Sequence, residues 1–136
     1  MANTGYDWGA YAALQSAVVL TTAGTVTNTS SEVDLDVKAG CEVSVAATYS
    51  DHVKATSGLT VYVLRSYDGT SYQVVGDEPW GFEMVFTQNA TNYIVFNVDP
   101  GQAGSFKLLI VWGNTTGSST VTVTTRYRTA DIPAAS

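Results

Sequence analysis

The chain has 136 residues, of which 45% are hydrophobic and 13% are charged, and its formal net charge at pH 7 is −6. This length and composition favour one folded domain with its own core and argue against intrinsic disorder. The acidic balance excludes the basic face that nucleic-acid binding requires, and it disfavours binding to anionic membranes.

An aromatic segment opens the chain, before any strand pattern begins. We expect residues 1–15, which include Tyr6, Trp8 and Tyr11, to form an N-terminal arm with one helical turn from Asp7. The segment lacks the positive cluster and apolar stretch of a signal peptide, so we expect none. No later run approaches the ~18 consecutive apolar residues that a membrane span needs.

Hydrophobic periodicity predicts strands along most of the remaining chain. Residues 32–37 and 120–127 alternate strictly between apolar and polar positions, which is typical of half-buried strands. Residues 59–64, 93–98 and 106–112 are almost continuously apolar. Such runs suit strands that are covered on both faces, either at the centre of a sandwich or where a partner covers the outer face. Further strands are expected at residues 16–20, 41–49, 71–75 and 83–88.

Turn residues separate these runs and predict the fold. Asp68-Gly69 favours a tight hairpin, because a type I′ turn needs positive φ angles. Eight or nine short strands without helical crossovers predict an all-β, antiparallel β-sandwich that is jelly-roll-like. We expect an N-terminal arm at residues 1–15, a β-sandwich domain at residues 16–128 and a short C-terminal tail at residues 129–136.

Few residues suggest chemistry. His52 is the only histidine and has no nucleophile motif near it, so we interpret it as a solvated loop residue. The single cysteine, Cys41, excludes an intrachain disulfide and is expected to be a small apolar strand residue. Glu32, Asp34 and Asp36 share one strand face, which favours a solvated outer face over a calcium site. We therefore expect no catalytic residue, no metal, no cofactor and no enzyme activity.

Large aromatic residues outside the strands are the main candidates for binding. They could pack on the chain's own core, anchor a protein interface or stack on a sugar. For the sugar alternative, the candidate platforms are Trp80, Tyr72 and Trp112. For the interface hypothesis, the candidate residues are Tyr6, Trp8, Tyr11, Leu14, Trp80 and Phe82.

Three features together carry a family resemblance. They are the short methionine-initiated arm, the hairpin at residues 65–72 with its Asp68-Gly69-Thr70 turn, and the apolar run at residues 106–112 followed by Gly113-Asn114-Thr115-Thr116-Gly117 and an alternating Thr/Val strand. With these features the chain resembles the small virion β-sandwich proteins of tailed bacteriophages, particularly capsid decoration (cement) proteins.

The resemblance implies a virion protein on the capsid exterior, made in the host cytoplasm. It would be a homo-oligomer, dimer or trimer, that binds the major capsid protein, bridges neighbouring capsid subunits and stabilises the shell. From its acidic charge balance we expect it to bind no nucleic acid and no membrane. The alternatives are another virion component (tail, head-fibre or baseplate) and a carbohydrate-binding β-sandwich module.

Overall fold

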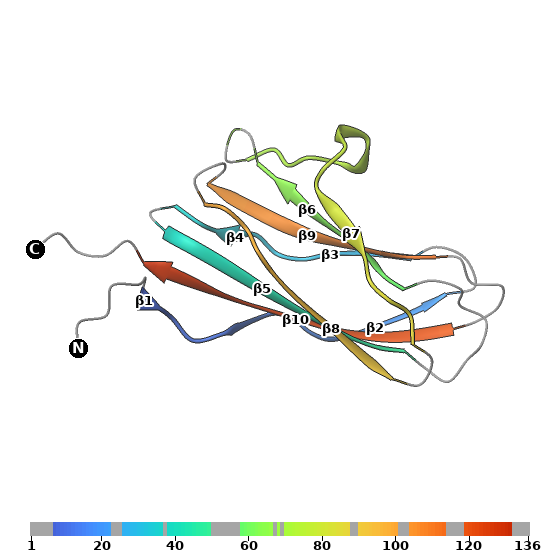
Figure 1. Cartoon of the computed structure of the whole chain (residues 1–136). Coiled ribbons are helices and arrows are strands. Elements are labelled where there is room, and N and C mark those ends of the chain that lie inside the picture. The colour runs from blue at the N-terminus through green and yellow to red at the C-terminus, as the bar shows by residue number, and fades with distance from the viewer. Residues whose placement is uncertain are drawn as a thin grey trace, which may run out of the picture.

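The computed structural model describes residues 7–22, 26–36, 38–49, 58–66, 68, 70–87, 90–100, 104–113 and 119–131. Figure 1 shows that most of them belong to long strands. No helix in these ranges has the length and apolar character that a membrane crossing requires. In chain order the elements are β1 (Asp7–Trp8), β2 (Ala12–Thr22), β3 (Val26–Thr29), β4 (Val33–Asp34), β5 (Lys38–Tyr49), β6 (Thr60–Arg65), the 3-10 turn η1 (Val75–Asp77), β7 (Gly81–Glu83), β8 (Thr91–Asn97), β9 (Ser105–Trp112) and β10 (Ser119–Asp131).

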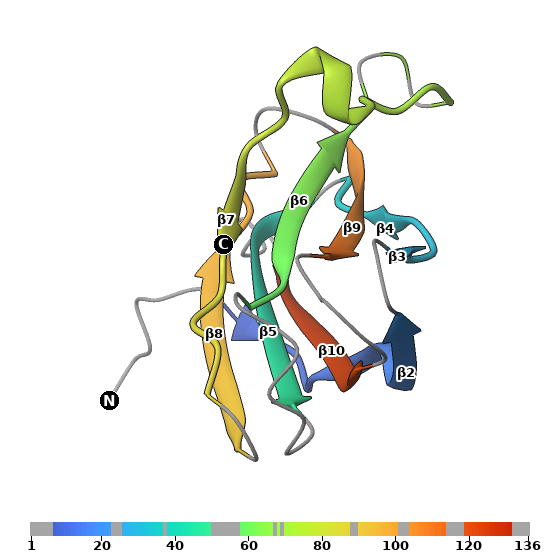
Figure 2. The same cartoon turned by 90° about the vertical axis from the view of Figure 1, so that its right-hand side faces the viewer.

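The strands form two antiparallel sheets that face each other, as the end-on view of Figure 2 shows. Sheet A has the order β2-β10-β5-β8. β1 pairs with the same edge of β10 as β2 does, but farther along β10, at Ala130 and Asp131. Sheet B has the order β3-β9-β6-β7, with β4 beside β3 on the same edge of β9. The chain changes sheet between β2 and β3, β4 and β5, β5 and β6, β7 and β8, β8 and β9, and β9 and β10. This winding is a jelly roll, and it confirms the predicted all-β, antiparallel sandwich.

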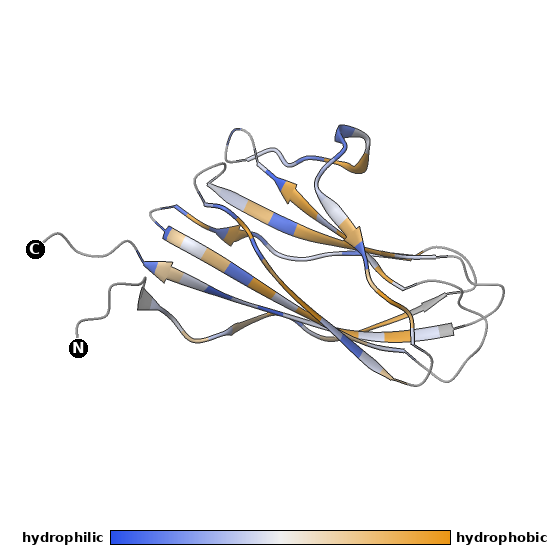
Figure 3. Cartoon of the chain, viewed as in Figure 1, coloured by the Kyte–Doolittle hydropathy of each residue, from blue (hydrophilic) through white to orange (hydrophobic). Residues whose placement is uncertain are grey.

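The core lies between the inner faces of the two sheets. Along β5 and β9 buried positions alternate with half-buried ones, because successive side chains of a strand point to opposite faces. Figure 3 shows hydrophobic and hydrophilic bands following one another along β5. At one end of the core, the rings of Tyr49 and Trp112 lie 6.2 Å apart and the ring of Phe86 lies 5.0 Å from Tyr49. The Tyr49 hydroxyl also accepts a hydrogen bond of 3.0 Å from the backbone N–H of Leu59. The buried hydroxyl oxygen of Tyr49 therefore has a hydrogen-bond partner inside the core.

The amino-terminal segment differs from the expected arm. Asp7 does not start a helical turn, since β1 pairs with Asp131 and Ala130 of β10. The next strand begins at Ala12 instead of residue 16, so residues 12–15 lie in sheet A. The physical reason is the length of β10, which extends past its pairing with β2 and leaves an edge that β1 occupies. The first residues of the expected tail, 129–131, belong to β10 as well.

Three predicted strands are much shorter than expected. The strand expected at residues 32–37 contributes only β4, Val33–Asp34. Residues 71–75 contribute only the bridge of Tyr72 with Ser66, because the Asp68 carboxylate accepts the N–H groups of Thr70 and Ser71 and keeps the chain in a turn. Instead of a strand at residues 83–88, β7 begins at Gly81 and ends at Glu83. The N–H of Met84 still donates to the carbonyl of Leu59 at 2.7 Å, and residues 85–87 then leave sheet B to reach β8.

Candidate interaction surfaces

An aromatic cluster lies on the outer face of sheet A, where β1 and the end of β10 meet. Trp8 is paired with Ala130, and a side chain at Gly40 would come within 3.1 Å of the Trp8 ring. The Arg128 guanidinium carbon lies 4.8 Å from the centre of the Trp8 ring and 5.0 Å from that of Tyr11. Cation–π attraction therefore joins the three side chains. We call Trp8, Tyr11, Glu42 and Arg128 the amino-terminal patch.

Hydrogen bonds fix the charged members of this patch. The Tyr11 hydroxyl donates to a carboxylate oxygen of Glu42, and the Arg128 Nε–H donates to the same oxygen at 3.1 Å. The bond from Tyr11 is the main cause that lowers the pKa of Glu42, and the same bond raises the pKa of Tyr11. Because Glu42 and Arg128 neutralise each other, the patch presents exposed aromatic rings without an unpaired charge.

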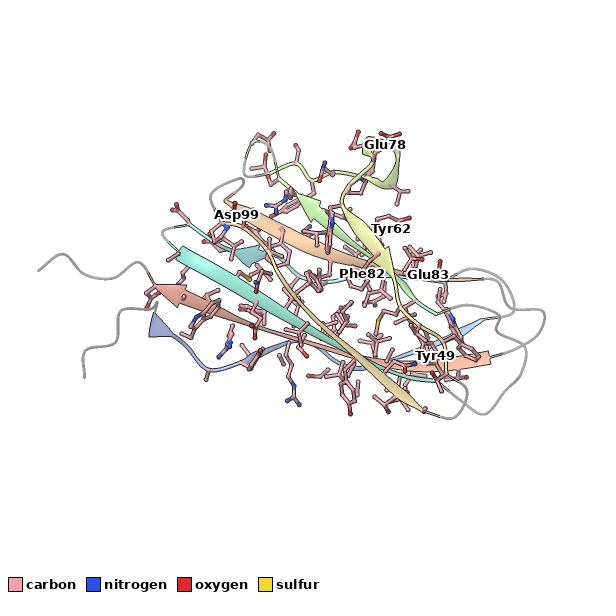
Figure 4. All side chains as sticks on the ribbon, in the orientation of Figure 1. Tyr49, Tyr62, Glu78, Phe82, Glu83 and Asp99 are labelled. Atoms are coloured by element: carbon pink, nitrogen blue, oxygen red, sulfur yellow. The ribbon has the colours of Figure 1, made fainter. Side chains whose placement is uncertain are left out.

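A second apolar surface follows the side of the sandwich where β7 and β8 lie. The rings of Trp80, Phe82 and Phe96 form a triangle with centre distances of 5.2 to 5.4 Å. Figure 4 shows Phe82 and Glu83 next to each other on β7, where Phe82 is half-buried and Glu83 is exposed. Trp80 remains 55% exposed. We define the β7–β8 surface as Trp80, Phe82, Val85, Tyr93, Val95 and Phe96.

The outer face of β8 makes this surface larger than the loop aromatics alone. Tyr93 is 74% exposed and Val95 is 56% exposed. The apolar run at residues 93–98 predicted a strand covered on both faces. The described chain covers only its inner face, where Ile94 and Phe96 pack against the core. An apolar outer face of this kind is the part of the sequence pattern that folding does not explain.

A shallow trough crosses the outer face of sheet A between β8 and β10. Its volume is about 390 Å³. The middle strand supplies a floor of small side chains, and register places Ala46 between Tyr93 on one side and Thr124 on the other. Tyr93 and Arg126 are the large side chains of its walls. The residues that line it are Ser44, Ala46, Thr48, Thr91, Tyr93, Thr124 and Arg126.

The structure divides the six predicted interface residues between different surroundings. Trp8 and Tyr11 lie in the amino-terminal patch, whereas Trp80 and Phe82 lie in the β7–β8 surface. Leu14 is half-buried on β2 and packs against the core. Tyr6 lies outside the described residues.

Sequence reasoning missed Glu42, Arg128, Tyr93 and Val95. Tyr93 and Val95 could have been found from the sequence, because the almost continuous apolar run of their strand predicts an apolar outer face. Glu42 and Arg128 become neighbours only through the register of β5 with β10, which pairs the two residues directly.

The structure also places most of the residues that were considered for catalysis, metal binding or sugar binding. Cys41 is buried, and burial raises the pKa of its thiol to about 12, which makes it a poor nucleophile. Glu32, Asp34 and Asp36 are exposed, and within the described ranges no three Asp, Glu, His or Cys side chains gather into a metal site. His52 lies outside those ranges. Of the sugar platforms, Trp112 is wrong, because it is fully buried in the core.

The fold is similar to that of solved viral and carbohydrate-binding structures. A structure of the infectious bursal disease virus Gx strain matches 93% of this chain with a TM-score of 0.56 and 14% identity, and this chain spans 32% of that viral chain. The VP2 subviral particle of the same virus matches 90% with a TM-score of 0.56 and 11% identity, again over 32% of the viral chain.

A carbohydrate-binding module also shares this architecture. TmCBM61, solved in complex with β-1,4-galactotriose, matches 85% of this chain and 70% of its own, with a TM-score of 0.51 and 12% identity. No model of a protein family and no curated protein matches the chain. At these identities the likeness shows the fold alone: a jelly-roll sandwich of the kind found in virus particles and in carbohydrate-binding modules.

Proposed function

We propose that this chain is a non-enzymatic virion structural protein that binds the outer surface of a capsid, bridges major capsid subunits and stabilises the shell. The observation that carries the proposal is the separation of its exposed apolar residues into two surfaces. One is the amino-terminal patch on sheet A, and the other is the β7–β8 surface at the far edge of the same sheet. The resemblance to phage decoration proteins supports the same role.

Two surfaces on one rigid body are what a bridging protein needs. In this proposal the amino-terminal patch contacts a capsid subunit, and the β7–β8 surface joins copies of the chain. An oligomer then carries one capsid contact per copy, so several weak contacts act together as a strong attachment. The low charge content, 13% of residues, reduces the number of charges that such contacts must desolvate. The net charge of −6 keeps the protein from binding the packaged nucleic acid non-specifically.

Binding to undecorated shells tests this role. We expect Trp8→Ala and Tyr11→Ala each to weaken binding by about 30-fold, because truncating an aromatic anchor at an interface costs about 2 kcal/mol. Val19→Ala is the matched control, since Val19 is an exposed apolar residue of β2 outside both surfaces. Point variants are preferable to deleting residues 1–14, because that deletion would also remove β1 and part of β2 from sheet A. Unchanged binding by both aromatic variants would contradict the proposal.

Shell stability provides the second readout for bridging. We expect shells saturated with the native protein to disassemble at a higher temperature than undecorated shells, and shells mixed with Trp8→Ala to behave as undecorated ones. A protein that binds without raising this temperature attaches to the capsid but does not bridge its subunits.

The trough on sheet A favours a second candidate function, carbohydrate binding. Hydroxyl side chains line it, Tyr93 offers an exposed ring and Arg126 offers N–H donors, which together suit a glycan. A glycan array followed by titration tests this function. Tyr93→Ala should abolish sugar binding in the trough, whereas Trp80→Ala should leave it intact. The opposite result would move the sugar platform to Trp80, and no binding of any glycan would exclude the function.

A further inference from the structure

Among the described residues, the outermost strand of sheet A has one unpaired side. Within that part of the chain β8 pairs with β5 alone, and the backbone N–H of Val98 donates to the carbonyl of Cys41 at 3.0 Å. At the other end, the N–H of Tyr49 donates to the carbonyl of Ala90, also at 3.0 Å. Hydrogen-bonded pairs alternate along an antiparallel ladder. The even-numbered residues of β8 therefore bond to β5, and the N–H and C=O groups of residues 91, 93, 95 and 97 point away from the sheet.

The other sheet edges of the described chain carry features that discourage pairing, whereas β8 carries none. β2 has a bulge, with Ala17 at a φ of 47° and two register shifts against β10. β7 has three residues, and β3 and β4 are short. β8 has seven residues in unbroken register, without a charge or a proline.

Apolar side chains flank this edge on both sides. Tyr93 and Val95 project from the outer face beside their unpaired backbone groups. On the other side lie the Trp80–Phe96 ring contact and Val85, whose carbonyl accepts a hydrogen bond of 3.0 Å from the Asn92 side chain. A strand added here would bury apolar surface as well as complete backbone hydrogen bonds.

We propose that the occupant of this edge is β8 of a second copy of the chain, antiparallel to the first and related to it by a two-fold axis at Ile94. In that register Tyr93 lies opposite Val95 of the second copy, and Thr91 lies opposite Asn97 of the second copy. Aromatic residues and β-branched residues form favourable cross-strand pairs. The contact also places no like charges opposite each other, although each copy carries a net charge of −6. Sheet A would continue through both copies.

Symmetry closes this assembly. The same strand is used on both copies, so the interface is isologous and ends at a dimer instead of growing into a fibre. The inference rests on the oligomeric state proposed above and identifies its surface. In the capsid role, such a dimer would carry two amino-terminal patches, one for each bridged subunit.

Light scattering of the full chain tests the dimer. We expect the native protein to have twice the chain mass of 14.4 kDa, falling to one chain mass on dilution. Val95→Pro should be monomeric at every concentration, because proline removes an N–H that points away from β5 and leaves the bonds of sheet A intact. Val75→Pro is the control and should remain dimeric, because Val75 is the exposed first residue of η1 and follows an extended residue, a position that proline suits. A native monomer, or a folded Val95→Pro protein that is still a dimer, would overturn the inference.

A disulfide experiment tests the register without depending on a proline. In the double variant Tyr93→Cys/Val95→Cys, each new cysteine faces its counterpart on the second copy at the ~5.5 Å spacing of a hydrogen-bonded pair, which a disulfide can span. Diamide, as the oxidant, should convert this variant to a covalent dimer. The single variant Val74→Cys should cross-link little, and native Cys41 is buried. Equal cross-linking of both variants would refute the pairing. Since no capsid is used, failure here is distinct from failure to bind shells.

Discussion

β5 and β8 lie side by side over seven residues, and their inner faces are alike but their outer faces are not. Val45 on β5 and Ile94 on β8 are paired and both face the core. On the outer face, β5 presents small or polar residues such as Ser44 and Thr48, whereas β8 presents Tyr93 and Val95. Packing dictates the inner residues of both strands. Nothing in the fold requires large apolar residues outside, and this difference is the observation behind the proposed contact of β8 with a second copy.

Among the interior positions, we expect a substitution at Gly58 to cause the largest loss of stability. A Cβ on this residue would lie 2.0 Å from the backbone oxygen of Met84 and 2.9 Å from the Tyr49 hydroxyl, so backbone must move to admit it. We expect Gly58→Ala to lower the free energy of unfolding by about 3 kcal/mol, the upper part of the usual range for overpacking. Chemical denaturation measures the loss. Gly76→Ala is the control, because no atom lies within 4 Å of its added Cβ, and it should be nearly neutral.

Two valines on the paired strands provide the direct comparison. Val45→Ala removes buried methyl groups and should cost about 2 kcal/mol of unfolding free energy, from lost transfer energy and a residual cavity. Val95→Ala removes the same atoms from an exposed position and should change stability by less than about 0.5 kcal/mol. The measurement uses dilute protein, so that a dimer does not contribute. Equal losses would mean that the outer face of β8 is covered within the chain itself.

The sequence predicts the features that alternate with a regular period. In residues 32–36, Val33 and Leu35 are buried and the three acids are exposed, as the pattern indicates. The pattern fails at Gln15, a polar residue that faces the core. It is satisfied there by a hydrogen bond of 3.0 Å from the Thr125 hydroxyl and by one to Asn28. A buried amide breaks the period, so the first part of β2 is not recognisable before its partners are known.

The candidate surfaces were predictable only in part, because they depend on register. The aromatic residues stand out by type, and four of the six predicted interface residues lie in the two surfaces described above. Which of them meet is decided by pairings between distant segments, such as Trp8 with Ala130 and Glu42 with Arg128. A single sequence contains no local signal for those pairings, whereas the apolar outer face of β8 is visible in its own seven residues.

The smallest effect is expected at Glu42, a carboxylate on the outer face of β5 and the residue opposite Asn97 of β8. Folding lowers the pKa of Glu42, mainly through the hydrogen bond from Tyr11. A lowered pKa stabilises the folded state above the unfolded value of 4.5, and this contribution is lost as the pH falls through the folded value. The melting temperature should therefore fall less between pH 6 and pH 3 in Glu42→Gln than in the native protein. Glu78→Gln, at an exposed carboxylate beside η1, should retain the native acid sensitivity. If Glu42→Gln melts with the full native pH dependence, the patch is not held together by this carboxylate, and the polar outer face of β5 contributes no more to stability than that of any solvated strand.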